Sequence, residues 1–222
     1  MNLFFSKKIN VISAIVVFIL MVFNIYNITS NTPMVPDQFW AQKIFYFHVP
    51  IAWTGFLSYL IVMIAGVLYL INKRTIWDHL GYAAAEIGTL FIVLVLITGP
   101  IWAKPIWGTW WTWEPRLTTT LILFLIYVGY FMLRKFGGHP ERTSRYAAVL
   151  GIVAFFDVPI IFYSVRFWEE RYQSHPQVEI AKQNPDIIIP FLISLIIFSI
   201  LFSFMLKYRL HVLKVALNGK KN

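Results

Sequence analysis

Six long apolar blocks divide this chain, and they constrain its fold more than any other feature of the sequence. They lie near residues 10–28, 50–71, 83–101, 118–133, 146–164 and 187–206. A helix needs about 20 residues to cross a hydrocarbon core of roughly 30 Å. The blocks are too long for barrel strands and lack period-two alternation. They predict an all-α integral membrane protein, a bundle of six transmembrane helices that forms a single domain over residues 1–222.

The composition excludes a soluble domain of this length. Of the 222 residues, 59% are hydrophobic and 13% are charged, which leaves too little polar surface for solubility. The chain has no cysteine, so disulfides, thiolate metal sites and covalent thioether attachment to this chain are excluded. The first apolar block follows Lys7 and Lys8, as in a signal peptide. No small-x-small cleavage site follows it, and we interpret it as a retained helix.

The distribution of basic residues predicts how the helices are oriented. With an even number of crossings, both termini lie on one side of the membrane. That side would hold 13 of the 19 lysines and arginines, and the other side would hold 6. This is the positive-inside bias, so both termini are expected in the cytoplasm. The net charge of +9 is therefore explained by the orientation of the helices in the membrane, and no nucleic-acid partner is expected.

The segment at residues 102–117 is rich in tryptophan and is expected on the outer side, before the fourth apolar block. Four of the nine tryptophans fall within seven positions, namely Trp107, Trp110, Trp111 and Trp113. An ordinary aromatic belt is shared between the two membrane interfaces. We interpret the cluster as a platform for a flat aromatic ligand, and the alternative is that the rings only anchor the chain in the headgroups.

Two residues beside this cluster carry charge. Glu114 precedes Pro115, a pair that predicts the start of the fourth helix at the proline. If residues 107–113 formed a short interfacial helix, Trp107, Trp111 and Glu114 would share one face. Arg116 would lie at the positive end of the fourth helix dipole, where a cation is disfavoured. Its partner would be Glu114 or the carboxylate of a bound ligand.

Two of the five histidines, His48 and His175, are expected on the same outer side. Neither is expected inside a helix, whereas a membrane cytochrome b holds heme between histidines buried in the bilayer. Imidazole is a natural axial ligand of heme iron, so the two form a candidate ligand pair. The alternative is two solvent-facing histidines.

Two acidic residues, Asp157 and Glu86, fall within apolar blocks, where charge is costly. Asp157 also precedes an expected kink at Pro159.

These segments resemble a known family. WGTWWTWEPRLTT is similar to the tryptophan-rich signature of the heme-handling proteins of cytochrome c biogenesis. YFHVPIAW, residues 46–53, resembles the first histidine motif of that family, and WAKPIWGTWW, residues 102–111, extends the match. DVPIIFYSVRFW, residues 157–168, resembles the segment that leads to the second histidine. The length and the six expected helices are similar to those of the cytochrome c maturation protein C branch.

The resemblance implies a function and a set of partners. Members bind heme b on the outer face of the cell inner membrane, over the tryptophan segment and between two outer histidines. They present it to a membrane-tethered periplasmic heme chaperone. The further partners implied are ABC-type transporter subunits and a small single-helix subunit. By this resemblance His48 and His175 would be axial ligands, the tryptophans would stack on the macrocycle, and Arg116 would pair with the propionates.

The chain departs from the family pattern at two positions. Glu114 stands where the family has an aspartate, so the carboxylate is kept one methylene further out. Tyr172 occupies the usual place of the second histidine, and His175 follows three residues later. We favour His175 as the second ligand, with Tyr172 as the alternative, because tyrosine also ligates heme iron.

Two other functions compete with this prediction. A permease that moves heme across the membrane would need a polar path, and the sequence offers little beyond Asp157 and Glu86. A scaffold for other biogenesis subunits would hold no chromophore. The sequence contains no hydrolase, kinase or phosphate-loop constellation, so no enzymatic activity is expected.

Overall fold

The computed structural model describes residues 7–36, 38–167 and 183–219, and this part of the chain is helical with no strand. It contains six helical spans long and apolar enough to cross a membrane, which confirms the predicted fold class. The helices are α1 (Lys7–Asn31), α2 (Phe45–Asn72), α3 (Thr75–Trp107), α4 (Pro115–Phe136), α5 (Pro140–Phe155), α6 (Asp157–Phe167) and α7 (Pro185–Gly219). A short 3-10 helix, η2 (Trp40–Ile44), leads into α2, and α5 and α6 together form the fifth span.

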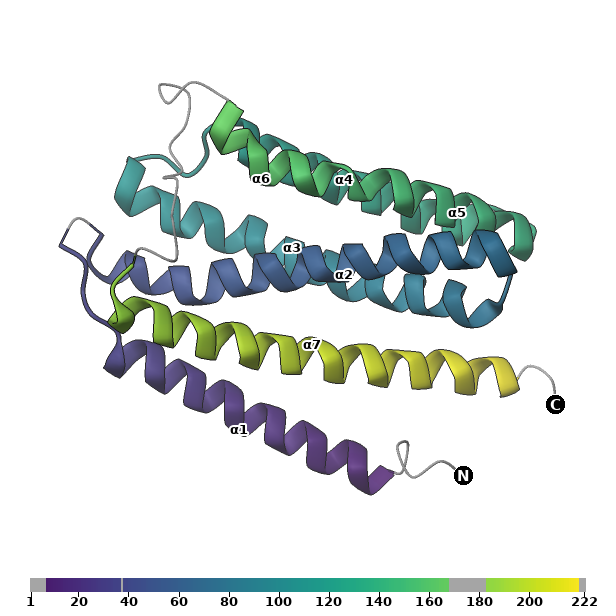
Figure 1. Cartoon of the computed structure of the whole chain (residues 1–222), viewed down its shortest axis with the longest axis horizontal. Helices are drawn as coiled ribbons and strands as arrows, with labels where there is room; N and C mark the ends of the chain where they lie inside the picture. Colours follow the sequence, from purple (N-terminus) through teal and green to yellow (C-terminus); the bar gives the residue numbers. More distant parts are fainter. Residues whose placement is uncertain (1–6, 37, 168–182, 220–222) are drawn as a thin grey trace.

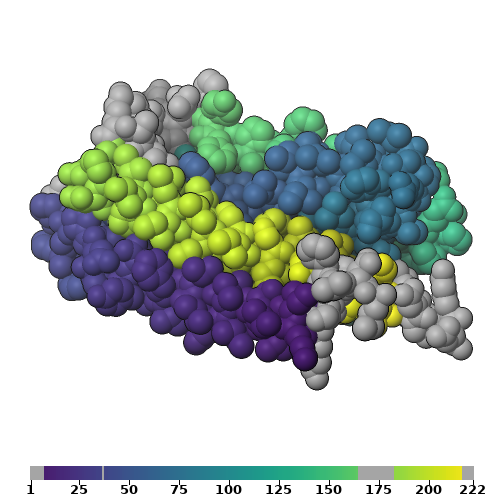
Figure 2. Space-filling view, turned by 60° about the horizontal axis from the view of Figure 1, so that its bottom comes forward, coloured from purple at the N-terminus to yellow at the C-terminus, as the bar shows by residue number. Residues whose placement is uncertain are grey.

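The helices lie roughly side by side in one elongated bundle (Figure 1). α2 is central and packs against α3, α5 and α7, whereas α1 packs mainly against α7 at the edge (Figure 2). α1 begins and α7 ends at one end of the bundle. The α3–α4 connection and η2 lie at the opposite end. This arrangement gathers the tryptophan-rich segment and the start of α2 at the same end.

Two helix ends differ from the sequence prediction. α2 begins at Phe45, so His48 lies in its first turn, and the expectation that neither histidine lies inside a helix was wrong for His48. The preceding η2 already turns helically, which lets α2 start before Pro50. α3 was expected to end near residue 101, but it continues to Trp107 and ends at Gly108, whose φ of 74° is the left-handed conformation that glycine adopts freely.

Two proline predictions were confirmed. α4 begins at Pro115, the first helical position, where the missing N–H is not needed. The fifth span is interrupted at Phe156, whose amide donates to the Val153 carbonyl at 3.1 Å rather than to the residue one full turn back. Pro159 lacks the N–H that would reach the Phe155 carbonyl, so the regular helix restarts as α6 at Asp157.

The core joins α2, α3 and α4 through stacked aromatic rings and short polar contacts. The fully buried rings of Tyr59 and Tyr127 stack with centroids 3.9 Å apart. Ser58 Oγ donates to the Ala84 carbonyl at 2.6 Å. A Cβ at Gly88 would lie 2.9 Å from the Tyr59 ring, so only glycine permits this approach of α2 and α3. Small residues and interhelical hydrogen bonds are the usual means of helix association in lipid.

Gly151 and Gly129 provide a matched test of this packing. A Cβ at Gly151 would lie 2.7 Å from Val62 Cγ1, whereas one at Gly129 would meet nothing within 4 Å. Gly151→Ala is expected to destabilise the fold by about 1–3 kcal/mol through overpacking. Gly129→Ala is expected to stabilise it by about 0.5–1 kcal/mol through helix propensity. Denaturant unfolding in detergent would measure both, and equal effects would show that the contact at Gly151 does not restrict packing.

α1 is held to the bundle at two places. Lys43 Nζ donates to the carbonyls of Ile28 at 3.0 Å and Thr29 at 2.7 Å. These hydrogen bonds satisfy carbonyl groups near the end of α1 and place a cation at the negative end of its helix dipole. Ser194 of α7 donates to Asn24 Oδ1 at 2.8 Å, and both side chains are buried. The remaining faces of α1 expose apolar side chains, as expected for a helix in contact with lipid.

Candidate functional site

The His48 ring is hydrogen-bonded to α3. Its Nδ1 lies 2.8 Å from Thr98 Oγ1, and the Thr98 hydroxyl lies 2.7 Å from the Leu94 carbonyl oxygen. That carbonyl can only accept, so the single hydroxyl proton of Thr98 is donated to it. The Thr98 oxygen therefore accepts from Nδ1–H of His48. In the neutral imidazole this tautomer leaves the lone pair on Nε2, the form in which a histidine ligates a metal through Nε2.

The same part of α3 packs against the His48 ring. Trp102 lies edge to face with it, with ring centroids 5.7 Å apart and planes at 65°. A Cβ at Gly99 would lie 3.3 Å from His48 Cε1, so a side chain there would crowd the imidazole. Thr98 and Trp102 are one helical turn apart and share this face. Thr98 and Gly99 lie within the third apolar block and were not predicted as site residues, because no local pattern shows which face of that helix meets a residue 50 positions away.

The tryptophan segment is irregular, which corrects the suggestion of a short interfacial helix there. Gly108 ends α3, and Glu114 is held extended before Pro115, so Trp107, Trp111 and Glu114 do not share a helical face. Trp107 is the half-buried last residue of α3. Trp110 and Trp113 are 57% and 76% exposed, which leaves large aromatic surfaces open at this end of the bundle.

Trp111 is packed differently from its neighbours. Its ring lies edge to face with Trp113, with centroids 5.8 Å apart. Within the described residues, the Nε1 atoms of Trp111 and Trp102 are buried without a hydrogen-bond acceptor. A buried indole N–H normally has a partner. These two donors therefore depart from the usual pattern of buried indoles.

The charged residues at this end have distinct environments. Glu114 is 4% exposed and is the residue before α4, and its backbone carbonyl accepts from the Thr118 amide at 3.0 Å. Arg116 is half-buried in the first turn of α4, and in the described part of the chain no carboxylate lies within 4.0 Å of its guanidinium. Lys104 Nζ donates to the Gly108 carbonyl at 2.8 Å and lies 6.0 Å from the Trp110 ring centroid.

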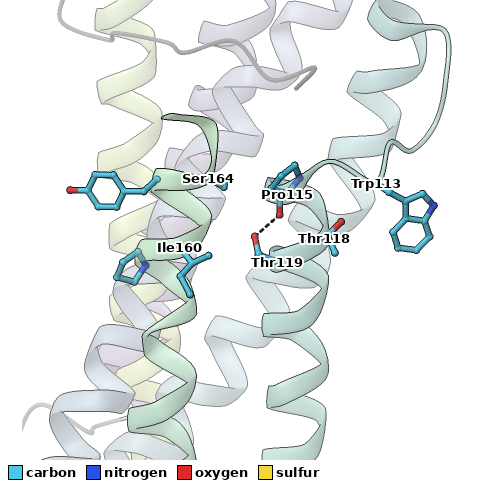
Figure 3. Close-up of a pocket in the computed structure, with 8 residues that line it drawn as sticks. Trp113, Pro115, Thr118, Thr119, Ile160 and Ser164 are labelled. Carbon is cyan, nitrogen blue, oxygen red and sulfur yellow. Dashed lines mark hydrogen bonds between the residues drawn. The ribbon is translucent and has the colours of Figure 1, made fainter. Parts of the chain in front are cut away.

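A pocket of about 500 Å³ opens between the start of α4 and the side of α6. Pro115 and Thr119 of α4 face Ile160 and Ser164 of α6 (Figure 3), and the pocket is completed by Trp113, Thr118, Pro159 and Tyr163. The Thr119 hydroxyl donates to the Pro115 carbonyl at 2.7 Å, which leaves a largely apolar wall. The volume falls within the range of small-molecule sites.

The second predicted ligand has no structural description. His175 and its alternative Tyr172 lie outside the described residues, so the pairing of His48 with either remains a prediction. The structure does bring His48 together with Thr98 and Trp102, and Trp110 with Lys104.

Comparison with known proteins assigns the family. The model of the family CcmC, heme exporter protein C, matches residues 2–221 of this chain. The chain belongs to this family. It is 36% identical over 177 residues to heme exporter protein C of Bradyrhizobium diazoefficiens, covering 78% of this chain and 67% of that protein. It is 33% identical over 139 residues to heme exporter protein C of Escherichia coli K12, covering 63% of this chain and 57% of that protein.

A plant relative extends the comparison. A putative cytochrome c biosynthesis ccmC-like mitochondrial protein of Marchantia polymorpha is 38% identical over 131 residues, covering 59% of this chain and 55% of that protein. The matched part of the chain thus spans between about half and two thirds of the length of these three relatives. The family consists of heme-handling membrane proteins and not of enzymes.

Proposed function

We propose that this chain, as a single transmembrane domain, binds heme b on the outer face of the cell inner membrane and delivers it to a membrane-tethered heme chaperone during cytochrome c biogenesis. The observation that carries the proposal is the hydrogen bond from His48 to Thr98, which directs the lone pair to Nε2 within the motif YFHVPIAW. Family membership supports the coarser role in heme handling.

The side chains at this end of the bundle fit an iron porphyrin. When bound, heme supplies an iron that accepts an imidazole nitrogen as axial ligand. His48 would provide that nitrogen, and His175 or Tyr172 would provide the second ligand. The exposed Trp110 and Trp113 offer flat surfaces for a macrocycle, and the buried N–H groups of Trp102 and Trp111 suit a polar ligand edge.

The charges fit the propionates of such a ligand. Arg116 is half-buried and has no carboxylate at ion-pair distance among the described residues. A guanidinium binds a carboxylate through two parallel hydrogen bonds, so a propionate would satisfy it. Glu114 beside it would favour one orientation of the ligand by repelling carboxylates from its own side. The positive-inside bias supports an outer position for these residues, with the termini in the cytoplasm.

The proposed delivery of heme implies a set of partner proteins. The proposed acceptor is the periplasmic heme chaperone, and ABC-type transporter subunits with a small single-helix subunit are the proposed companions in the bilayer. The test is to load the purified chain with heme, mix it with heme-free chaperone, and separate the two. Heme on the chaperone supports delivery. Heme accumulating inside vesicles that contain this chain alone would favour a permease, and a chain that never retains heme would favour a scaffold.

Thr98→Val tests the hydrogen bond on which the proposal rests. Valine keeps the shape of the threonine but cannot accept from Nδ1–H, so His48 loses its fixed tautomer and orientation. Loss of such a partner typically lowers metal affinity about 10–100-fold, and that loss of heme affinity is the expected result. Thr98→Ser should retain wild-type affinity. Nitrogen NMR of His48 in the heme-free chain should show the Nδ1–H tautomer, and an Nε2–H tautomer would contradict the assignment.

A further inference from the structure

α3 starts at the end of the bundle where α1 begins and α7 ends (Figure 1), and three polar residues follow one another along one face of its first part. Asp78, Tyr82 and Glu86 are spaced by one helical turn each, so they share this face. Asp78 and Glu86 are eight residues apart, which corresponds to about 12 Å along the helix axis. Charged groups within a membrane-spanning helix are costly and mark functional sites by default.

Two ion pairs flank these residues, one from each neighbouring helix. Arg134 of α4 contacts Asp78 through both guanidinium nitrogens, at 2.6 and 2.9 Å. Arg209 of α7 contacts Glu86 in the same bidentate manner, at 2.6 and 2.8 Å. The Tyr82 ring lies between them, 4.5 Å from the Arg134 guanidinium carbon and 5.8 Å from that of Arg209. Helices α4 and α7 are thus tied to α3 on either side of one face.

This face of α3 opens into a groove of about 740 Å³. Its charged part is formed by Glu86, Arg134 and Lys135, and its apolar part by Leu90, Val93 and Phe131. Tyr82 and Thr89 complete the lining. Leu90 is 46% exposed, so the apolar part faces the surrounding bilayer. The groove therefore joins a charged part, nearer the start of α3, to an apolar part further along the helix.

The charge of the groove is positive. The charged side chains of its lining are the cations Arg134 and Lys135 and the carboxylate Glu86, which leaves an excess of one positive charge. In the described part of the chain, Lys135 has no carboxylate within 4.0 Å, and its ammonium lies over the Phe136 ring at 5.3 Å. A bidentate guanidinium still has N–H groups to donate, since it carries five. The groove can therefore bind one further anion of low charge.

We propose that this groove is a binding site for an anionic phospholipid of the leaflet that faces the termini. The phosphodiester would accept from Lys135 and from the remaining N–H groups of Arg134. An acyl chain would lie along Leu90, Val93 and Phe131. Basic pockets between transmembrane helices are known to hold anionic headgroups, and the groove has the matching charge and an apolar extension that a free phosphate would not use. Glu86, in the charged part of the groove, lies about 18 Å along α3 from Thr98, the partner of His48, so the headgroup site is separate from that contact and is independent of the proposed heme function.

The experiment uses the absence of cysteine in the chain. Leu90→Cys introduces a single thiol in the groove, to which a fluorophore is attached in the full-length protein in neutral detergent. Brominated phosphatidylglycerol is expected to quench this fluorophore at least about tenfold more effectively than brominated phosphatidylcholine. Lys135→Gln should weaken the binding of phosphatidylglycerol about fivefold, the value that corresponds to roughly 1 kcal/mol for one lysine near an anionic headgroup.

Lys73→Gln is the matched control, because Lys73 follows α2 at the same end of the bundle but does not line the groove. It should leave quenching unchanged. Equal quenching by both lipids, or an equal effect of Lys73→Gln, would overturn the proposal. Displacement of the lipid by millimolar inorganic phosphate would identify a free-anion site instead and would also overturn it.

Discussion

His48→Gly is expected to lower the heme affinity of the purified chain by more than about a hundredfold. Losing a supporting hydrogen bond to a metal ligand already lowers metal affinity about 10–100-fold, and losing the ligand itself should cost more. Nε2 of His48 is the nitrogen that the Thr98 contact leaves with the lone pair. Heme titration followed by optical absorption measures the loss. Imidazole added at millimolar concentration should restore part of the spectrum, because it can occupy the space of the missing ring.

Matched variants separate ligand loss from other effects. His139→Gly alters a histidine at the start of α5, at the opposite end of the bundle, and should leave heme affinity unchanged. His175→Gly and Tyr172→Phe then identify the second ligand, since only the residue that coordinates should change the spectrum. If His48→Gly retained the wild-type affinity and spectrum, His48 would not be a ligand and the proposed site would be wrong.

Asp78→Asn is expected to destabilise the fold by about 3–5 kcal/mol, because it leaves the Arg134 guanidinium buried without its counter-charge. The two side chains are only 12% and 15% exposed and lie 2.6 Å apart. Replacing both by leucine should cost much less, since removing a whole buried pair is often nearly neutral. Denaturant unfolding of the three proteins in detergent gives the comparison.

An exposed ion pair supplies the control for this prediction. Glu141 and Arg145 form a pair one helical turn apart on α5, with side chains 61% and 51% exposed. Glu141→Gln should change the free energy of unfolding by about 0.3–0.5 kcal/mol. If Asp78→Asn had an effect no larger than Glu141→Gln, the Asp78–Arg134 pair would not contribute to holding α4 against α3.

The predictions from sequence succeeded where the cause is local. The six spans follow from runs of apolar residues, because the length needed to cross a bilayer depends only on the helical rise. Pro115 begins α4 and Pro159 follows the break before α6, because proline lacks an N–H wherever it stands. The tryptophan cluster was visible directly, although Gly108 and Pro115 keep it from forming the helix that was considered for it.

The sequence by itself determined the membrane-spanning helices, the position of the tryptophan segment between α3 and α4, and His48 as the candidate ligand of the first motif. Only the tertiary structure decided which side chains meet. The His48–Thr98 contact joins residues 50 apart, and the Glu86–Arg209 pair joins residues 123 apart. Such contacts depend on how each helix is rotated against its neighbours. That rotation results from the packing of the whole bundle, at close approaches such as Gly88 on Tyr59, and no local pattern specifies it.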